Sequence, residues 1–598
     1  MHNYTFDAET NGILLQEQEI NPVACKEPRP VYSEEMNLLE FNGRYKYPVE
    51  CNAPLMWAER RNYFYKGLKL ASLKGSEFVT KPVLADEGSI FANDVLQPCN
   101  IPLMIDKNRA LITALADSAI KRVKKYYNEY KNKTNAIWVS FSGGKDSMVL
   151  LDIVQRALPH DAFKVFFTNT HMEFPDTYDY IDRIRVWCTD RNIDFIVCQS
   201  DMLPEDSWHL FGPPCSYIRW CCSVHKSAPQ QLKAREIYGR IGIKAFSFVG
   251  CRASESLARS KYDFLAKGKK HTGQDSLNPI LDWNSAEVWL YTYARNLPVN
   301  IAYRKGNNRV GCILCPGGTK LREYIASRCY PEMYQKFYQY LKDTYDPKVL
   351  YTGDINDPHL GKIWVARKNG NGLLIPCNYE DQRQNDTWVF TLTKVRTDWR
   401  EWIKTIGILL NDKSPYQIRF RKGVYSFTVQ PLAGGGLDVR TTDLHTRECK
   451  SFIKMLKQVF RKAACCVMCR VCEADCPFGC LKMKDGKIAI SDDCRHCSCC
   501  HKPKSGCYIY HSTWKRRNGK YYYMVHKDKK MMIQNHDCCK CGHAITDKDI
   551  ISINKKLLGP RTKQFMCLKC LAAFFGTTED VLRGRIEDLK DSGCPLFK

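Results

Sequence analysis

The sequence has no apolar run long enough to cross a membrane, which takes about 20 consecutive, mainly apolar residues. Its first residues, Met1–Asp7, have neither the basic start nor the apolar core of a secretory signal peptide. We therefore expect a cytoplasmic protein with no membrane partner. Because disulfides are rare in that compartment, the 31 cysteines of this 598-residue chain indicate metal binding instead.

Acidic residues are also in short supply. The chain has 64 Asp and Glu against 90 Lys and Arg, a formal net charge of +26. Such a balance favours polyanionic partners, either nucleic acid or phosphorylated substrates. Anionic metal–thiolate clusters would neutralise part of this charge.

The sequence lacks the Walker phosphate-binding pattern at its glycine-rich loop, Ser142-Gly143-Gly144-Lys145-Asp146-Ser147. An apolar run expected to be a buried strand precedes the loop, and an expected helix follows it. Backbone N–H groups at such a turn and the helix dipole both favour an anion. Lys145 adds a positive charge, and Ser142 and Ser147 add hydroxyl donors. The loop resembles the PP-loop of the ATP pyrophosphatase superfamily, whose members split ATP into AMP and pyrophosphate.

Residues 136–300 alternate apolar strands and amphipathic helices, which predicts an α/β fold with a parallel sheet and helices on both faces. A long helix is expected at 107–132, and the expected strands are 136–141, 163–168, 195–198 and 245–249. Ligands of such sheets bind beyond the carboxyl ends of the strands. The polar segments 169–177 and 250–256 follow two of these strands, so we expect a ligand site there.

These segments resemble the phosphoadenosine phosphosulfate (PAPS) reductase family over about residues 110–345. The resemblance rests on the PP-loop, on Phe174-Pro175-Asp176-Thr177 and on Gly250-Cys251-Arg252-Ala253-Ser254-Glu255-Ser256. It implies an adenine nucleotide alpha hydrolase-like domain that binds ATP or an adenylylated sulfur compound (APS or PAPS). The expected nucleotide-binding residues are Ser142, Gly143, Gly144, Lys145, Asp146, Ser147, Thr168, Gly250 and Arg252. Among these, Lys145, Asp146 and Arg252 are the expected catalytic residues, and Asp146 is expected to lie near Mg²⁺.

Two cysteine pairs fall inside the same region: Cys221-Cys222 and Cys312-x-x-Cys315. The combination is similar to adenosine phosphosulfate (APS) reductases that carry a 4Fe–4S cluster beside the nucleotide. It implies that these four residues hold one cluster, and zinc in the same four thiolates is the alternative.

The chain departs from the reductases in two ways. They carry a catalytic cysteine in a C-terminal Glu-Cys-Gly-x-His segment, and Gly593-Cys594-Pro595 is not that motif. They also tend to have a degraded PP-loop, whereas this loop is intact, as in relatives that consume ATP, such as DNA phosphorothioation proteins. Both departures point away from simple sulfonucleotide reduction, and we expect ATP with Mg²⁺ to bind.

Eleven cysteines lie between Cys465 and Cys507, and their spacing matches bacterial ferredoxins. Cys466, Cys469, Cys472 and Cys476-Pro477 form the first run, in which the fourth cysteine binds the other cluster. The spacing therefore predicts two 4Fe–4S sets: Cys466, Cys469, Cys472 and Cys507, and Cys476, Cys494, Cys497 and Cys500. Zinc in this region is the alternative, and the Cys-Pro ending argues against it.

Near the C-terminus, Cys538-x2-Cys541 and Cys567-x2-Cys570 have the pattern of a structural zinc ribbon. Cys539 offers a competing register.

We expect five units along the chain: an N-terminal region at 1–105, the PP-loop domain at 106–345, an α+β region at 346–455, a ferredoxin-like domain at 456–512 and a zinc module at 513–598. Three functions fit this organisation. The chain is a sulfonucleotide reductase fed by its ferredoxin domain and a low-potential donor, an ATP-consuming sulfur transferase acting on DNA or RNA, or a nucleotide-sensing electron carrier.

Overall fold

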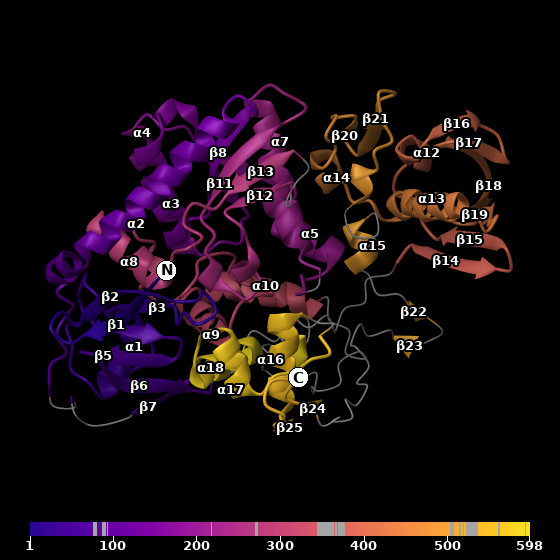
Figure 1. The fold of residues 1–598 in the computed structure, drawn as a ribbon. Coiled ribbons are helices and arrows are strands. Elements are labelled where there is room, and N and C mark those ends of the chain that lie inside the picture. Colours follow the sequence, from indigo (N-terminus) through magenta and orange to yellow (C-terminus); the bar gives the residue numbers. More distant parts are fainter. Residues whose placement is uncertain are drawn as a thin grey trace.

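The computed structural model describes residues 1–75, 81–86, 91, 94–216, 218–268, 273–343, 364, 368, 377–502, 507–512, 516–517, 520–521, 536–559, 562–591 and 594–597. Figure 1 shows an α/β unit at the centre of the chain, with the N-terminal sheet and the C-terminal helices below it and a second large sheet to one side. No helix in these ranges is both long enough and apolar enough to span a membrane.

The central unit is a six-stranded sheet in the order β10-β9-β8-β11-β13-β12, parallel except for the pairing of β12 with β13. Its strands are β8 (Ala136–Phe141), β9 (Lys164–Asn169), β10 (Phe195–Gln199), β11 (Ala245–Val249), β12 (Leu265–Lys267) and β13 (Gln274–Leu277). The four strands expected from the sequence are confirmed to within one residue at each end.

Helices cover both faces of this sheet because successive side chains point to opposite sides. Trp138 and Phe166 pack on one face together with Ala234 of α7, whereas Val139 and Phe167 belong to the core on the other face. The helices of this unit are α2 (Ile101–Tyr130), α3 (Lys145–Ala157), α4 (Pro175–Thr189), α5 (Pro204–Phe211), α6 (Trp220–Cys222), α7 (Ala228–Ile237), α8 (Ser285–Ala294), α9 (Lys320–Cys329) and α10 (Pro331–Asp343).

The N-terminal region is built from antiparallel strands. A hairpin of β1 (His2–Asp7) and β2 (Gly12–Glu19) precedes a five-stranded meander of β3 (Pro28–Val31), β4 (Met56–Glu59), β5 (Asn62–Tyr65), β6 (Leu68–Lys74) and β7 (Val83–Asp86), with α1 (Ser33–Leu38) alongside. Pro28 and Pro30 lie in β3, which is an edge strand and therefore tolerates the missing N–H groups.

Residues 379–465 form a second six-stranded sheet, which is antiparallel. Its strands are β14 (Tyr379–Gln384), β15 (Thr387–Leu392), β16 (Ile408–Asn411), β17 (Tyr416–Phe420), β18 (Gly423–Leu432) and β19 (Gly436–Thr442), and its helices are α12 (Trp399–Ile403) and α13 (Arg447–Cys465). Phe452 and Phe460 of α13 pack against rings of the sheet. Because α13 runs from 447 to 465, it crosses the domain boundary expected at 455 and 456.

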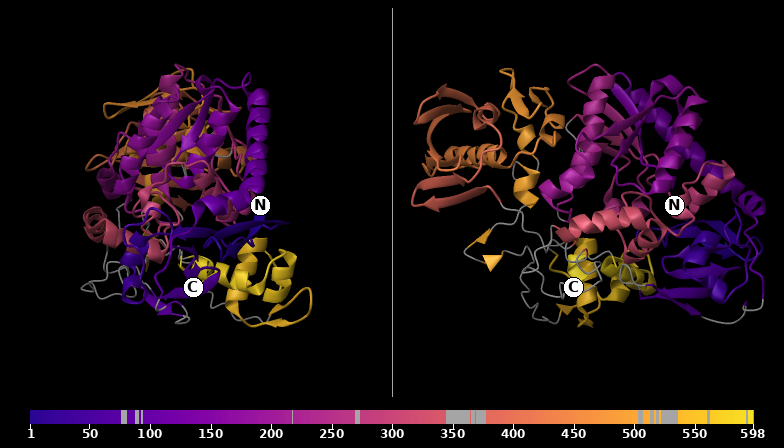
Figure 2. Two further views of the ribbon diagram at one scale, coloured as in Figure 1. Left: turned by 90° about the vertical axis from the view of Figure 1, so that its left-hand side faces the viewer. Right: turned by 180° about the vertical axis from the view of Figure 1, so that it is seen from behind.

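The cysteine-rich region, which is residues 466–502 and 507–512, lies between the two large sheets, as Figures 1 and 2 show. It contains α14 (Val471–Ala474), the hairpin β20 (Leu481–Lys484) and β21 (Lys487–Ile490), and α15 (Tyr508–Ser512). The C-terminal part contains the short strands β22 (Arg516–Arg517), β23 (Lys520–Tyr521), β24 (His536–Asp537) and β25 (Ala544–Ile545), followed by α16 (Lys548–Leu558), α17 (Leu568–Phe574) and α18 (Glu579–Asp591).

Candidate functional site

The PP-loop joins β8 to α3 in the middle of the sheet. Strand β8 has β9 on one side and β11 on the other, so the loop lies at the topological switch point, where ligands of open α/β sheets bind. Gly143 has a φ of +75°, and a Cβ at this position would lie 2.9 Å from Thr177 Cγ2. A Cβ on Gly250 would lie 2.7 Å from the carbonyl oxygen of Asp146. Both positions therefore require glycine.

Hydrogen bonds within the loop fix its shape. The Ser147 hydroxyl donates to the carbonyl of Gly144 at 2.7 Å and accepts from the backbone N–H of Ser142 at 3.2 Å. The backbone N–H of Lys145 donates to Tyr303 Oη at 3.0 Å. Ser147 thus braces the loop, and Tyr303, which the sequence pattern gave no reason to select, caps one of its N–H groups.

The three expected catalytic side chains come together beside the loop. Lys145 Nζ lies 2.9 Å from Asp146 Oδ2, and Arg252 Nε donates to Asp146 Oδ1 at 2.6 Å. Lys145 is 7% exposed and Arg252 is 2% exposed. Burial by itself would raise the pKa of Asp146, but Arg252 and Lys145 outweigh it and hold that pKa well below its usual range. The carboxylate therefore stays ionised and is bonded to both cations.

Glu27, from the N-terminal region, joins the same network. Its two carboxylate oxygens accept from Arg252 Nη1 and Nη2 at 3.0 and 2.8 Å. The aperiodic stretch around Glu27 carries no sequence signal for such a role. Thr168 lies farther along the same edge of the sheet, at the carboxyl end of β9, where its backbone pairs with Cys198.

A set of four cysteines lies beside the segment that follows β9. It contains the residues expected to share one metal centre, Cys221, Cys222, Cys312 and Cys315. A hydrogen bond to Cys222, burial and the nearby Cys312 and Cys315 raise the pKa of the Cys221 thiol well above its usual value. The backbone N–H of Ile313 donates to the carbonyl of Met172 at 2.6 Å, which ties the Cys312–Cys315 loop to the segment after β9.

Lys226 and Glu173 lie against this set. Lys226 Nζ is 3.6 Å from Glu173 Oε1, which is 3.8 Å from Cys312 Sγ. Burial opposes the charge of Lys226, but the neighbouring thiols and Glu173 raise its pKa well above the usual value. Glu173 Oε2 is buried without a hydrogen-bond partner among the described residues. Four thiols beside the Lys226 ammonium fit an anionic metal–thiolate centre.

The cysteine-rich region contains two further sets. In the first, burial raises the pKa values of the Cys466, Cys469 and Cys507 thiols, and the nearby Cys472 raises each of them further. In the second, Cys476, Cys494, Cys497 and Cys500 line a single cavity together with Cys480. Cys476 therefore lies with the second run, which is the exchange that the ferredoxin spacing implies. Cys465 belongs to neither set, because its thiol forms a hydrogen bond with the thiol of Cys377.

Lys462 of α13 lies between these two sets. It is 1% exposed, and its Nζ donates to Cys472 Sγ at 2.7 Å. Burial opposes its charge, but Cys472, Cys500 and Cys507 hold its pKa above the usual value. A cavity lined by five cysteines and a buried cation between two thiol sets both fit anionic metal–thiolate centres.

Direct contacts hold the cysteine-rich region on the PP-loop domain. The hydroxyls of Tyr508 and Ser223 are 2.8 Å apart. Arg235 of α7 donates to the main-chain carbonyls of Glu473, Ala474 and Cys476 at 2.9, 2.9 and 2.7 Å. A cavity of about 710 Å³ along this contact leaves Cys469 on its wall.

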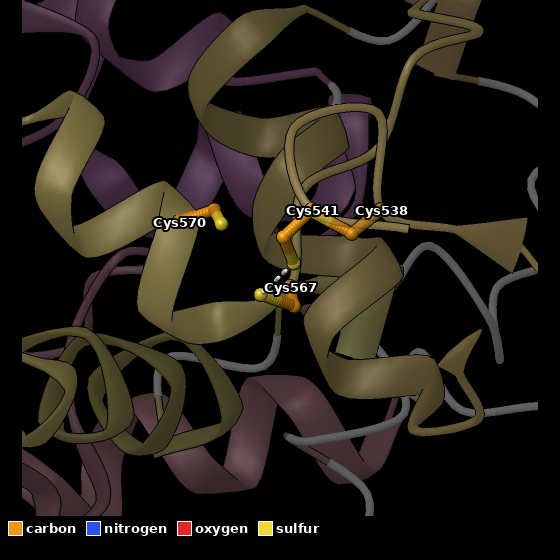
Figure 3. Close-up of side chains that lie close together, drawn as sticks. All are labelled: Cys538, Cys541, Cys567 and Cys570. Carbon is orange, nitrogen blue, oxygen red and sulfur yellow. Dashed lines mark hydrogen bonds between the residues drawn. The ribbon is translucent and has the colours of Figure 1, made fainter. Parts of the chain in front are cut away.

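Four cysteines of the C-terminal part form the tightest cluster among the described residues. Figure 3 shows Cys538, Cys541, Cys567 and Cys570, whose sulfurs all lie within 4.8 Å of one another. The sulfur atoms of Cys541 and Cys567 are 3.7 Å apart. Tetrahedral zinc with Zn–S bonds of about 2.3 Å holds its sulfur ligands about 3.8 Å from one another. Burial opposes ionisation of Cys538, but backbone N–H groups of Cys567, Lys540 and Cys541 lower its pKa to about 6. The set fits zinc, whereas Cys539 is exposed and outside it.

Comparisons with known proteins agree with this geometry. The model of the phosphoadenosine phosphosulfate reductase domain matches residues 136–318, a range that contains the PP-loop, Arg252 and the Cys221 set. An adenosine 5'-phosphosulfate reductase of Bacillus anthracis is 30% identical over 193 residues, which cover 32% of this chain and 78% of the relative. The chain therefore belongs to the phosphoadenosine phosphosulfate reductase family.

Other relatives extend the comparison. Two uncharacterized proteins of Methanocaldococcus jannaschii are 31% and 29% identical over 40% of this chain, and the matches span 55% and 48% of their lengths. This chain thus spans about half the length of these relatives. A PAPS reductase structure from Candida auris is 19% identical, covers 35% of this chain and 94% of its own, and has a TM-score of 0.26.

Proposed function

We propose that the chain is an adenine-nucleotide-dependent sulfur enzyme in which residues 456–512 supply electrons to the PP-loop domain. The two cysteine sets of that region and the Cys221 set are the proposed holders of 4Fe–4S clusters, which supply one-electron transfer when bound. The C-terminal set is the proposed holder of a structural Zn²⁺.

The contact between Tyr508 and Ser223 carries this proposal. Tyr508 directly follows Cys507 of the first set, and Ser223 directly follows Cys222. Their hydroxyls are 2.8 Å apart, so one hydrogen bond joins the residues next to two proposed ligands. An enzyme that moves electrons from the cysteine-rich region to the nucleotide site needs such a close approach.

The favoured substrates are adenylylated sulfate compounds, APS or PAPS, because several relatives are named as APS reductases. Lys145 and Arg252 provide positive charge for a phosphate or sulfate at the end of the sheet. Two electrons, which the cysteine-rich region would deliver, would break the bond between the sulfate sulfur and the bridging oxygen. APS would then give sulfite and AMP, and PAPS would give sulfite and adenosine 3',5'-bisphosphate.

A second function has its own support in the intact PP-loop. Lys145 and Asp146 lie together beside the loop, where they could hold the pyrophosphate of ATP and a Mg²⁺ ion. The chain would then adenylylate an acceptor with ATP and release pyrophosphate, and sulfide from a separate donor would displace AMP from that acceptor. The net charge of +26 favours nucleic acid as that acceptor.

One assay separates these functions. Protein purified without oxygen is mixed with a low-potential donor, reduced methyl viologen, and with APS, PAPS or ATP and Mg²⁺. Sulfite from APS or PAPS supports the reductase, and pyrophosphate from ATP supports the transferase. Nucleotide binding without either product would favour a nucleotide-sensing electron carrier. Cys469→Ser should abolish turnover and leave nucleotide affinity intact, while Cys51→Ser, at a half-buried cysteine of the N-terminal region, should change neither.

A further inference from the structure

Arg252 is already occupied in this structure. Four of its five N–H groups donate to side chains, one to Asp146 at 2.6 Å, two to Glu27 at 3.0 and 2.8 Å, and one to Ser254 at 2.9 Å. The paired bonds to Glu27 use the fork of the guanidinium, which binds carboxylate, phosphate and sulfate in the same two-point manner. An oxyanion that approaches this face meets the Glu27 carboxylate first.

Glu27 lies outside the matched family region at 136–318 and reaches the site from the N-terminal region. Its backbone has a φ of +57°, in the left-handed region that non-glycine residues rarely adopt. Its carboxylate also accepts from the backbone N–H of Ser285 at 3.3 Å. The strained conformation shows that surrounding contacts hold this side chain on Arg252.

The charges of the network balance in this arrangement. Lys145 and Arg252 are the two cations, and Asp146 and Glu27 are the two carboxylates in contact with Arg252. A nucleotide anion therefore gains little attraction from these four groups until one carboxylate leaves. Asp146 belongs to the PP-loop itself, whereas Glu27 lies on a separate segment of the chain.

We propose that Glu27 is an internal competitor for the oxyanion subsite of Arg252. In the ligand-free protein its carboxylate occupies the face of Arg252 that would bind the phosphoryl or sulfuryl group of the nucleotide. Binding of that group displaces Glu27, and segment 21–27 moves with it. The nature of the ligand rests on the proposed function, but the displacement itself does not depend on any turnover.

Arg585 of α18 holds this segment in place. Its guanidinium donates to the carbonyls of Val23 at 3.4 Å, Cys25 at 2.9 Å and Ser254 at 3.4 Å. These contacts link the C-terminal module to the segments that carry Glu27 and Arg252. Cys25 lies two residues before Glu27, and Ser254 lies two residues after Arg252. The C-terminal module thus sets how readily segment 21–27 leaves.

The test measures binding of inorganic pyrophosphate and of sulfate by calorimetry to the full-length protein. Glu27→Gln keeps the shape of the side chain but removes its charge, so we expect the Kd for pyrophosphate to fall at least fivefold. If the Kd for sulfate falls as well, the subsite accepts either oxyanion. If only the Kd for pyrophosphate falls, the subsite binds the phosphoryl group. Glu17→Gln, at an exposed carboxylate of β2, should leave both constants unchanged. A smaller decrease for pyrophosphate, any increase, or no binding by either protein overturns the proposal.

Amide hydrogen exchange on the unmodified protein gives a second test that needs no variant. Saturating pyrophosphate should speed exchange in residues 21–27 and slow it in the PP-loop. Unchanged or slower exchange in 21–27 would show that Glu27 is only a structural partner of Arg252. Failure of the sulfite and pyrophosphate-release assays would refute the proposed function and leave this result standing.

Discussion

Gly479 offers the sharpest test of how the cysteine-rich region is held on the PP-loop domain. It has a φ of +63°, and an added Cβ would overlap Ile241 Cγ2 of the PP-loop domain and lie 3.2 Å from Ile241 Cβ. Gly486, in the hairpin of the same region, has a φ of +73°, but a Cβ there meets nothing within 4 Å. Alanine at either position has the same unfavourable backbone conformation. Only alanine at Gly479 also clashes with a residue of the PP-loop domain.

The structure sets the size of the effect. Alanine in the left-handed region costs about 1–2 kcal/mol at either site. The Ile241 side chain is 57% exposed and can shift, so the clash adds about 1 kcal/mol at Gly479 alone, the low end of the range for overpacking. Since 1.4 kcal/mol is tenfold in an equilibrium constant, about 1 kcal/mol shifts the ratio of attached to detached region about fivefold. We therefore expect Gly479→Ala, but not Gly486→Ala, to weaken the Arg235 and Tyr508 contacts.

The assay compares both variants for iron content, turnover and protease cleavage between the two regions. Gly479→Ala should keep its iron, lose most turnover and become easier to cleave. Adding Ile241→Ala removes the overlapping Cγ2 and should restore part of the turnover. Equal behaviour of the two glycine variants, or no rescue by Ile241→Ala, would refute the assignment of this contact to electron delivery.

Four further predictions concern metals and charges. The intact protein should hold about twelve iron atoms, four for each of three cysteine sets, and Cys221→Ala should remove about four of them while the other centres keep their spectra; loss of all iron would contradict the separation of the sets. Lys145→Ala should raise the transition-state free energy by about 2–4 kcal/mol, read as a fall in kcat/KM; an unchanged value would exclude the PP-loop from the reaction. Lys462→Met removes a buried cation beside Cys472 and should make the potential of that centre more negative in a redox titration; a more positive potential would contradict this. Cys567→Ser should release zinc and lower the Tm of the C-terminal module, whereas Cys539→Ser should do neither.

The sequence predicts the central sheet well because buried parallel strands are continuous apolar runs. The expected strand at 163–168 differs by one residue from β9, Lys164–Asn169. The long helix is expected at 107 but begins at Ile101, because Asn100 caps it and Pro102 fits its first turn. In the second sheet, apolar patterns in the sequence predict strands only at 386–392 and 424–429, which correspond to β15 and β18. β14 is the polar run YEDQRQ and gives no apolar pattern.

The candidate site likewise contains some residues that the sequence predicts and others that it does not. Lys145, Asp146 and Arg252 lie in recognisable motifs, and the structure brings them together. Glu27 and Tyr303 escape prediction because their partners are 225 and 158 residues away in the chain and no local pattern marks them. Long-range polar contacts of this kind depend on how whole domains pack, which hydrophobic periodicity does not encode.

The contact made by Arg235 has a consequence for how this chain can change over evolution. Its guanidinium binds main-chain carbonyls of residues 473, 474 and 476. The contact therefore depends on the path of the backbone and not on which side chains these residues carry. This contact places no requirement on the side chains at 473 and 474, as long as the backbone keeps its path around Cys476. The cysteine-rich region could therefore change in sequence, or be exchanged for a related module, without redesign of the domain that it contacts.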